Sequence, residues 1–269
     1  MPAKAVFWGM LLISSLVPFY TYSCTLTMGY RTSDRAPLIA AAPNNNGLYK
    51  HFYQLVAEKL GCELNIIRGP KKRILKQLQD GDIDFYPGFN FNEARANYTF
   101  YIENGFPGGE IGISRQDLPQ ITALKQLEGY TILQALGSPD FVRNLENVKI
   151  YTVPDMSIAK AIGFLRKKRG DFYIYNRTSL LFYLKTHHIE DIQVHPNCCG
   201  GVEPIYLGFS RQSVHFKEQP NLDFDQNGNF SPNNFPTKLE EASLAYKMMQ
   251  VLLQMKESGE TEAIYQQYY

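Results

Sequence analysis

The sequence predicts an α/β fold in which two lobes enclose a cleft and are joined by two crossing strands. A β-α-β-α-β pattern of apolar residues spans residues 25–86, a second spans residues 111–175, and a strand at 205–209 can cross back between them. Strands that alternate with helices form parallel sheets with right-handed crossovers. A chain of 269 residues has room for two lobes of modest size.

Apolar periodicity and helix-ending glycines define the first unit. Strands are expected at residues 25–30, 63–67 and 83–86, and helices at residues 48–60 and 70–80, which are followed by Gly61 and Gly81. A helical start after the third strand carries Arg95. Open α/β sheets bind ligands beyond the carboxyl ends of their strands, so the Arg95 guanidinium is expected to face a carboxylate there.

The second unit repeats this order. A strand near residues 111–113 and a helical turn at 124–127 precede strands at residues 130–134, 148–153 and 171–175. Ser138 and Asp155 are expected to cap helices, the second of which ends at Gly170. Thr237-Lys238-Leu239-Glu240 is interpreted as the capping box of a long helix. The apolar stripe expected on that helix consists of Leu239, Ala242, Tyr246, Met249 and Leu253.

The N-terminus predicts export. Lys4 and the apolar run of residues 7–17 have the character of a signal peptide, with cleavage after Ser23; an uncleaved anchor is the alternative. The expected organisation is a signal peptide at residues 1–23, lobe I at 24–109 and 208–269, and lobe II at 110–207. The mature protein is therefore expected to be soluble and exported.

Four cysteines would then lie in an oxidising compartment. Cys24 and Cys62 each precede a strand and come within disulfide reach if these strands are parallel neighbours; the rival interpretation is lipidation of Cys24. Cys198 and Cys199 are interpreted as loop thiols, or as partners of other groups, in preference to a vicinal disulfide.

Composition excludes several functions. A net charge of +1 gives no support for nucleic-acid binding, and the basic runs at residues 71–73 and 166–169 are interpreted as solvated helix positions. No nucleophile elbow, HExxH, P-loop or dinucleotide fingerprint is present. Asp82 and Asp84 are interpreted as a turn residue and a strand start. The sequence therefore predicts no cofactor and no catalytic residues.

Two segments invite a metal hypothesis. Residues 223–228 match the opening of a calcium loop, but Asn234 stands where the bidentate glutamate is required, so an Asx-rich turn is preferred. His187, His188 and His195 lie near the cysteine pair without a zinc spacing and are interpreted as exposed loop residues. No metal site is predicted.

Three segments together carry a family resemblance. They are Gly81-Asp82-Ile83-Asp84 through Glu93-Ala94-Arg95 with Phe100-Tyr101 beyond, then Gly170-Asp171-Phe172-Tyr173-Ile174-Tyr175-Asn176, and Glu257 to Tyr265. In this order they resemble the bacterial extracellular solute-binding proteins of the polar amino acid ABC importers. The resemblance covers the mature chain and implies the two-lobed periplasmic binding protein type II fold, with the exported protein located in the periplasm.

The resemblance implies site residues as well. It assigns Arg95 to a ligand carboxylate, Asn176 to the position of an acid that holds an α-ammonium group, and cleft-facing groups to Gly88, Asn90 and Ser138. Tyr30 and Phe89 are expected to offer aromatic walls, whereas Phe85 is expected in the core.

Three positions depart from the family pattern. Asn176 lacks the charge of the usual aspartate, Asn92 replaces a threonine, and Pro139 lacks a backbone N–H. A standard α-amino acid is therefore in doubt, and a carboxylate, a peptide-like compound or a neutral molecule remains open.

The leading hypothesis is a monomeric, non-enzymatic binding protein. It captures a small carboxylate-bearing or amino-acid-like solute by hinge closure and delivers it to the membrane permease of an ABC importer. One alternative is a periplasmic sensor subunit for a membrane signalling receptor. Another is a cleft enzyme such as a cyclohexadienyl-acid dehydratase.

Overall fold

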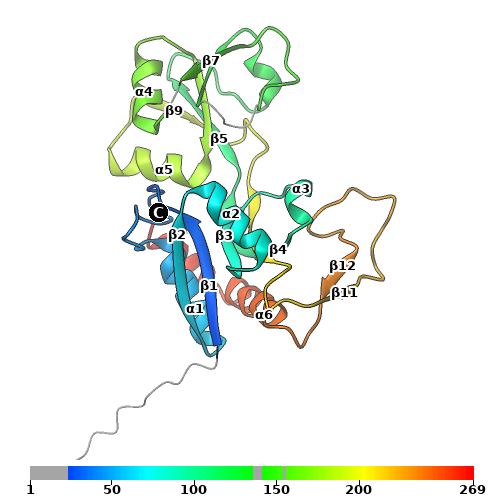
Figure 1. Cartoon of the computed structure of the whole chain (residues 1–269). Coiled ribbons are helices and arrows are strands. Elements are labelled where there is room, and N and C mark those ends of the chain that lie inside the picture. The colour runs from blue at the N-terminus through cyan, green and yellow to red at the C-terminus, as the bar shows by residue number, and fades with distance from the viewer. Residues whose placement is uncertain (1–23, 136–140, 154–155) are drawn as a thin grey trace, which may run out of the picture.

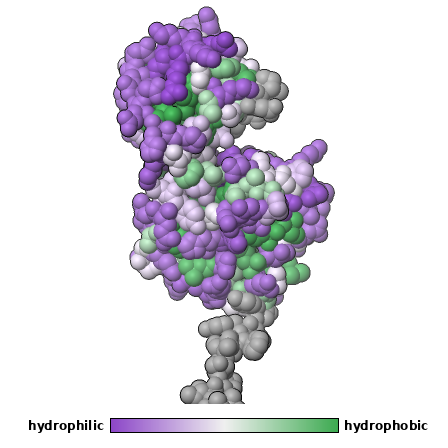
Figure 2. Space-filling view, turned by 90° about the vertical axis from the view of Figure 1, so that its left-hand side faces the viewer, coloured by the Kyte–Doolittle hydropathy of each residue, from purple (hydrophilic) through white to green (hydrophobic). Residues whose placement is uncertain are grey.

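The protein consists of two α/β lobes connected by a narrow waist, as expected (Figure 1 and Figure 2). The computed structural model describes residues 24–135, 141–153 and 156–269. The expected signal peptide and the expected caps Ser138 and Asp155 lie outside the described residues. Within the described ranges, no helix is long and apolar enough to cross a membrane.

Lobe I, the lower lobe in Figure 1, is built on a five-stranded sheet of order β2-β1-β3-β10-β4. Its strands are β1 (Cys24–Arg31), β2 (Cys62–Gly69), β3 (Phe85–Phe89), β4 (Thr99–Gly108) and β10 (Glu203–Ser210). β1 pairs in parallel with β2 and β3, whereas β10 runs antiparallel to β3 and β4. The predicted parallel core is confirmed. The sequence analysis missed β4, because Gly105 and Pro107 interrupt its strand pattern.

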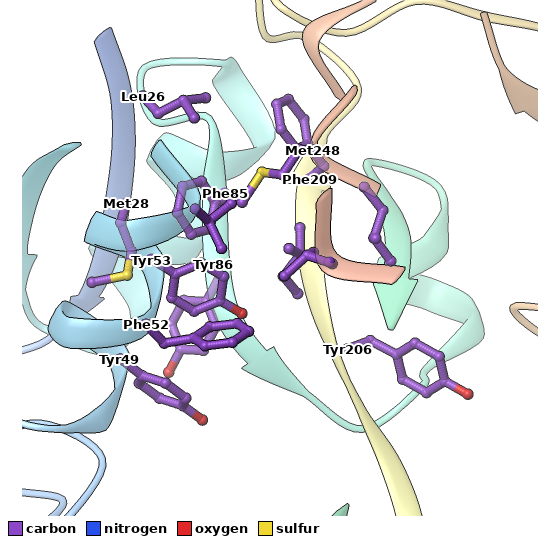
Figure 3. Packing of buried hydrophobic residues seen from close by; sticks show 14 of the residues in the cluster. Leu26, Met28, Tyr49, Phe52, Tyr53, Phe85, Tyr86, Tyr206, Phe209 and Met248 are labelled. Atoms are coloured by element: carbon purple, nitrogen blue, oxygen red, sulfur yellow. The ribbon is translucent and has the colours of Figure 1, made fainter. Parts of the chain in front are cut away.

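Aromatic side chains fill the core of lobe I. Its helices are α1 (Leu48–Lys59), α2 (Lys71–Asp80), α3 (Glu93–Ala96), α6 (Leu244–Glu257) and α7 (Glu260–Gln266). Helix α1 places Tyr53 against Phe85 of β3 and Phe52 against Tyr53, and Phe85 is fully buried as expected (Figure 3). This packing fixes the position of the carboxyl end of β3, from which the candidate site begins.

Lobe II has a second five-stranded sheet, of order β7-β6-β8-β5-β9. Its elements are β5 (Glu110–Arg115), the 3-10 helix η1 (Leu124–Leu127), β6 (Thr131–Ala135), β7 (Lys149–Val153), α4 (Ile158–Arg166), β8 (Phe172–Asn176), α5 (Arg177–Thr186) and β9 (Ile192–His195). β6 is parallel to β7 and β8, whereas β5 is antiparallel to β8 and β9. Helix α5 follows β8 directly and faces lobe I (Figure 1).

The chain crosses between the lobes twice. The first crossing joins β4 to β5 through Gly109, and the second enters β10 after Gly200 and Gly201. All three glycines have positive φ angles, of 89°, 105° and 80°, which favour glycine. The expected lobe boundary between residues 207 and 208 falls inside β10, which pairs with the first sheet from Glu203 to Ser210.

Two predicted helix starts differ in the structure. Residues 237–239 form a short strand, β12, paired with β11 (Glu218–Pro220), so they do not cap the long helix. Helix α6 begins instead after Ser243, whose hydroxyl accepts a hydrogen bond from the Tyr246 amide, and helix α4 is capped in the same way by Ser157. The buried face of α6 is accordingly shifted, to Ala245, Met248, Leu252 and Met255. The prediction failed because an N-cap pattern in sequence does not exclude strand pairing.

The cysteines form two disulfides. Cys24 and Cys62 stand opposite each other in the β1–β2 pair and are bonded, as one of the two alternatives proposed. Cys198 and Cys199 form a vicinal disulfide, so their interpretation as loop thiols is wrong. The sequence does not show this, because adjacent cysteines bond only where the turn permits it.

His195 is also misplaced by the sequence analysis. It is fully buried in β9, where its Nε2 lies 2.8 Å from the Ser114 Oγ and its Nδ1 accepts from the Ile121 amide. His187 and His188 are exposed, as expected. The described residues contain no group of three His, Cys, Asp or Glu side chains arranged for a metal. Asp225 accepts from the Asn227 amide in an Asx turn.

Candidate functional site

A cavity of about 350 Å³ lies between the lobes, at the carboxyl ends of β1 and β3. This volume lies within the range of small-molecule sites. Its lining comprises Tyr30, Arg31, Arg35, Leu38, Tyr49, Lys71, Tyr86, Gly88, Phe89, Asn90, Phe91, Asn92, Arg95, Glu110, Asn176 and Ile205. Six of the seven residues expected at the site therefore surround one space, and Ser138, the seventh, lies outside the described residues.

Arg95 reaches the cavity from α3. Asn92 caps this helix by accepting from the Arg95 amide at 2.9 Å, which places the arginine directly beyond β3. Its Nη1 donates to the Asn90 carbonyl and to the Tyr101 hydroxyl, both at 3.3 Å. The guanidinium is therefore held in place by neutral acceptors and keeps its full charge for a ligand.

Phe89 supports Arg95. The Arg95 guanidinium carbon lies 4.1 Å from the centre of the Phe89 ring, and the Tyr86 ring stacks at 4.2 Å with an interplanar angle of 6°. Two groups at this separation occupy opposite faces of the ring, since both do not fit on one face. Phe89 thus orients Arg95. Because both faces of the Phe89 ring are covered, chiefly the edge of the ring is left for a ligand.

Gly88 permits close packing beneath the cavity floor. A Cβ atom at this position would lie 2.1 Å from the Tyr49 hydroxyl oxygen. Below it, Tyr53 donates to the Pro87 carbonyl at 2.7 Å, and the buried Asn104 amide donates to the same carbonyl at 3.0 Å. These bonds fix the backbone of β3 at the residues that line the site.

Asn176 lies at the end of β8 and caps α5. Its Oδ1 accepts from the Ser179 amide at 3.2 Å, the Thr178 hydroxyl at 2.7 Å and the Ser179 hydroxyl at 3.1 Å. Because the backbone amide requires an acceptor, the oxygen faces the helix. The group that Asn176 can offer a ligand is its NH₂, a donor.

Contacts across the cleft join the lobes. Asn90 donates to Glu110 at 3.2 Å, and Arg35 donates to the Tyr175 hydroxyl at 3.3 Å. The C-terminal Tyr269 accepts from Lys185 of α5 (Figure 1). Burial and the nearby Glu203 raise the pKa of Glu110, so its carboxylate is less readily ionised than usual.

The comparisons with known proteins agree with this geometry. The family model for bacterial extracellular solute-binding proteins, family 3, matches residues 26–269. The chain belongs to this family. The family is extracellular, which agrees with the expected export. No curated protein sequence matches the chain significantly.

Solved structures share the fold of this solute-binding protein at low sequence identity. The substrate-binding protein of an amino acid ABC transporter is 18% identical, with a TM-score of 0.57, over 91% of this chain and 99% of that one. A histidine kinase sensor domain with similarity to periplasmic binding proteins is 15% identical, with a TM-score of 0.60, over 91% and 95%. The ancestral amino-acid-binding protein AncCDT-1, a precursor of cyclohexadienyl dehydratase, is 16% identical, with a TM-score of 0.62, over 91% and 95%.

Sequence reasoning missed several charged residues of the candidate site. Arg31 and Arg35 lie at the end of β1 and in the loop after it, and Lys71 opens α2, where the sequence analysis interpreted it as solvated. A signal was available, since these residues follow the carboxyl ends of β1 and β2. Burial and the cations Arg31, Arg95 and Arg35 lower the pKa of Lys71.

Proposed function

We propose that this protein captures a small carboxylate-bearing solute in the interlobe cavity by hinge closure. Arg95 anchors the anionic group, Asn176 contributes a donor from the other lobe, and aromatic side chains form the walls. The observation that carries this proposal is a cavity between two lobes, lined by an arginine that neutral acceptors hold in position. A ligand that contacts both lobes binds the closed state better and thereby favours it.

Delivery to the permease of an ABC importer is the output that we propose. The likeness to the binding protein of an amino acid ABC transporter supports this choice at the level of fold. The likeness to a histidine kinase sensor domain supports a second candidate, a periplasmic sensor subunit. Loss of ligand uptake in cells without the protein would support transport, whereas unchanged uptake with altered signalling would support sensing.

We propose that the site binds without turnover. Its titratable groups within the described residues are dominated by cations and tyrosines, with Glu110 as the one carboxylate of the lining. The dehydratase relationship of AncCDT-1 makes an enzyme the further candidate. Recovery of the bound ligand unchanged after prolonged incubation, measured by NMR, would support binding alone.

The capture proposal is tested by thermal unfolding and small-angle scattering of the exported chain. The protein is first unfolded and refolded to remove bound ligand, and is then screened against amino acids and small carboxylates. A ligand at about 100 times its dissociation constant adds roughly 2.7 kcal/mol, which raises the melting temperature by several degrees. A matching decrease in the radius of gyration is the expected sign of closure. A panel that changes neither quantity would refute capture of this class of solute.

A further inference from the structure

The cavity carries an unusual excess of positive charge. Arg31, Arg35, Lys71 and Arg95 line it, whereas Glu110 is the only carboxylate among the lining residues that the structure describes. Glu110 already accepts a hydrogen bond from Asn90, and burial together with the nearby Glu203 raises its pKa. A single ligand carboxylate would therefore leave most of this charge without compensation.

The arginines that stabilise the fold have a different environment. Arg115 pairs with Asp117 and Asp171 and donates to two backbone carbonyls. Arg68 donates to the carbonyls of Arg31, Asn44 and Ala40. Each of these two arginines thus donates to several acceptors on its own lobe.

The cavity cations have neutral hydrogen-bond partners but no carboxylate partner among the described residues. Within the described ranges, none of the four forms an ion pair with a carboxylate. Arg31, Arg35 and Arg95 are placed instead against the rings of Tyr30, Tyr175 and Phe89, with guanidinium carbons 5.9, 5.7 and 4.1 Å from the ring centres. These distances lie within the range of cation–π contacts, which use no N–H group as a donor to a carboxylate.

Placing four cations around one cavity costs free energy because like charges repel. This cost suggests that the charges are retained for a function. Desolvation and its three arginine neighbours lower the pKa of Lys71, as expected for like charges gathered at one site. An anion bound there would offset this cost, since charge-assisted hydrogen bonds are roughly twice as strong as neutral ones. The arrangement is therefore complementary to more than one anionic group.

The same cavity offers little to an ammonium group. Three hydrogen bonds from α5 occupy the Asn176 oxygen, so this residue presents donors where the family pattern has an acid. The tyrosine hydroxyls are neutral, because burial raises the pKa of Tyr49 and Tyr86. A cationic group would also be repelled by the four nearby cations.

On the basis of the proposed capture function, we infer that the ligand is a small organic dianion without an ammonium group. It carries two carboxylates, or a carboxylate and a phosphate, on a short carbon chain or a small ring. Arg31, Arg35, Lys71 and Arg95 line the same cavity, and together they would take the two anionic ends. Asn176 donates to the ligand on closure and selects against ammonium compounds.

Glutarate and glutamate form the decisive pair of probes, because they share two carboxylates and differ by the ammonium group. Isothermal titration of the refolded protein is expected to show glutarate, or another unbranched dicarboxylate of two to eight carbons, binding at least tenfold tighter than glutamate. Phthalate and 3-phosphonopropionate test the ring and the phosphate-type end. Glutamate or glutamine binding more tightly than every dicarboxylate and phosphonate would overturn the inference and leave the capture proposal intact.

Variants sharpen the result. Asn176→Asp retains a good N-cap for α5 and adds a negative charge, so it is expected to weaken dianion binding at least tenfold and to narrow the preference over glutamate. Arg35→Gln is expected to weaken dianion binding at least tenfold.

Arg166→Gln is the matched control. It removes an exposed arginine of α4 that pairs with Asp191, and is expected to leave the affinity for the dianion unchanged. Equal effects of Arg35→Gln and Arg166→Gln would overturn the inference. If no compound of the panel binds, amino acids included, both the dianion inference and the capture proposal are refuted.

Discussion

The two lobes contribute unequally to the cavity. Glu110 and Asn176 come from the sheet of lobe II, whereas the other fourteen lining residues come from the strands, helices and loops of lobe I. Lobe I packs its buried residues into one continuous cluster, which includes the aromatic floor under Gly88. Lobe II divides its core into two smaller clusters on the opposite faces of its sheet.

This difference indicates a division of labour between the lobes. Lobe I holds a largely preformed half-site, because Arg95 and the aromatic wall are fixed by their own contacts in the lobe. In the proposed closure, lobe II would add a few donors and cover the ligand. Affinity should therefore reside mainly in lobe I and selectivity in lobe II.

The largest expected contrast is between Arg95→Ala and Asn176→Ala. Loss of a partly buried charged partner costs about 2–5 kcal/mol, so Arg95→Ala is expected to weaken the best ligand of the panel roughly 30-fold to several thousand-fold. Asn176→Ala removes a neutral donor and is expected to cost about 0.5–1.5 kcal/mol. Titration calorimetry measures both, and a larger effect at Asn176 would reverse the assignment of the lobes.

The disulfides provide a second contrast. Cys24 and Cys62 close a loop of 38 residues, so the double serine variant is expected to lower the free energy of unfolding by about 4 kcal/mol. Cys198 and Cys199 are adjacent and restrict almost no loop, so their double serine variant is expected to change it by less than about 1 kcal/mol. Denaturant unfolding under non-reducing conditions measures the difference. Equal losses would show that the vicinal pair stabilises lobe II in another way.

Acid should destabilise lobe II through His195. Burial lowers the pKa of this imidazole from 6.5 to about 4. Its Nδ1 already accepts a hydrogen bond from the Ile121 amide, so a proton added at Nδ1 would break this bond. The unfolded state therefore binds a proton first. Stability is fully present above pH 6.5 and is lost by roughly 2–3 kcal/mol as the pH falls towards 4.

The pH dependence can be assigned with His195→Gln. This variant is expected to be less stable at neutral pH but to lose much less stability between pH 6.5 and 4. Denaturant unfolding of both proteins across this range, followed by near-UV circular dichroism, measures it. A variant with the same acid dependence as the parent would exclude His195 as the source.

The smallest expected contrast is between two glycines. Gly88→Ala would bring a Cβ within 2.1 Å of the Tyr49 hydroxyl and is expected to cost about 1–3 kcal/mol, and less in a Tyr49→Phe background. Gly163 lies inside α4 with no atom within 4 Å of the position of a Cβ, so Gly163→Ala is expected to stabilise by up to about 1 kcal/mol. Thermal unfolding compares them. Loss of stability in both would contradict the packing argument for Gly88.

The sequence by itself determined the order of elements that carries the site. The parallel core of lobe I was predicted from two local signals. These are the glycines that end α1 and α2 and the apolar periodicity of the strands and helices around them, and both depend on local conformational preferences. The same reasoning placed Arg95 beyond β3, because chain order alone sets which residue follows a strand. Family resemblance then predicted Asn176 as the contribution of the second lobe, and it does line the cavity.

The tertiary structure decided which polar groups meet and what each one faces. Arg31, Arg35 and Lys71 gather around one space only because β1, α2 and β3 lie side by side, and the Asn176 oxygen is committed to α5 only in the folded chain. The burial of His195 likewise depends on pairing between β5 and β9. Local sequence fixes backbone periodicity, whereas the charge balance of a site is a sum over residues far apart in the chain. That sum follows only from long-range packing.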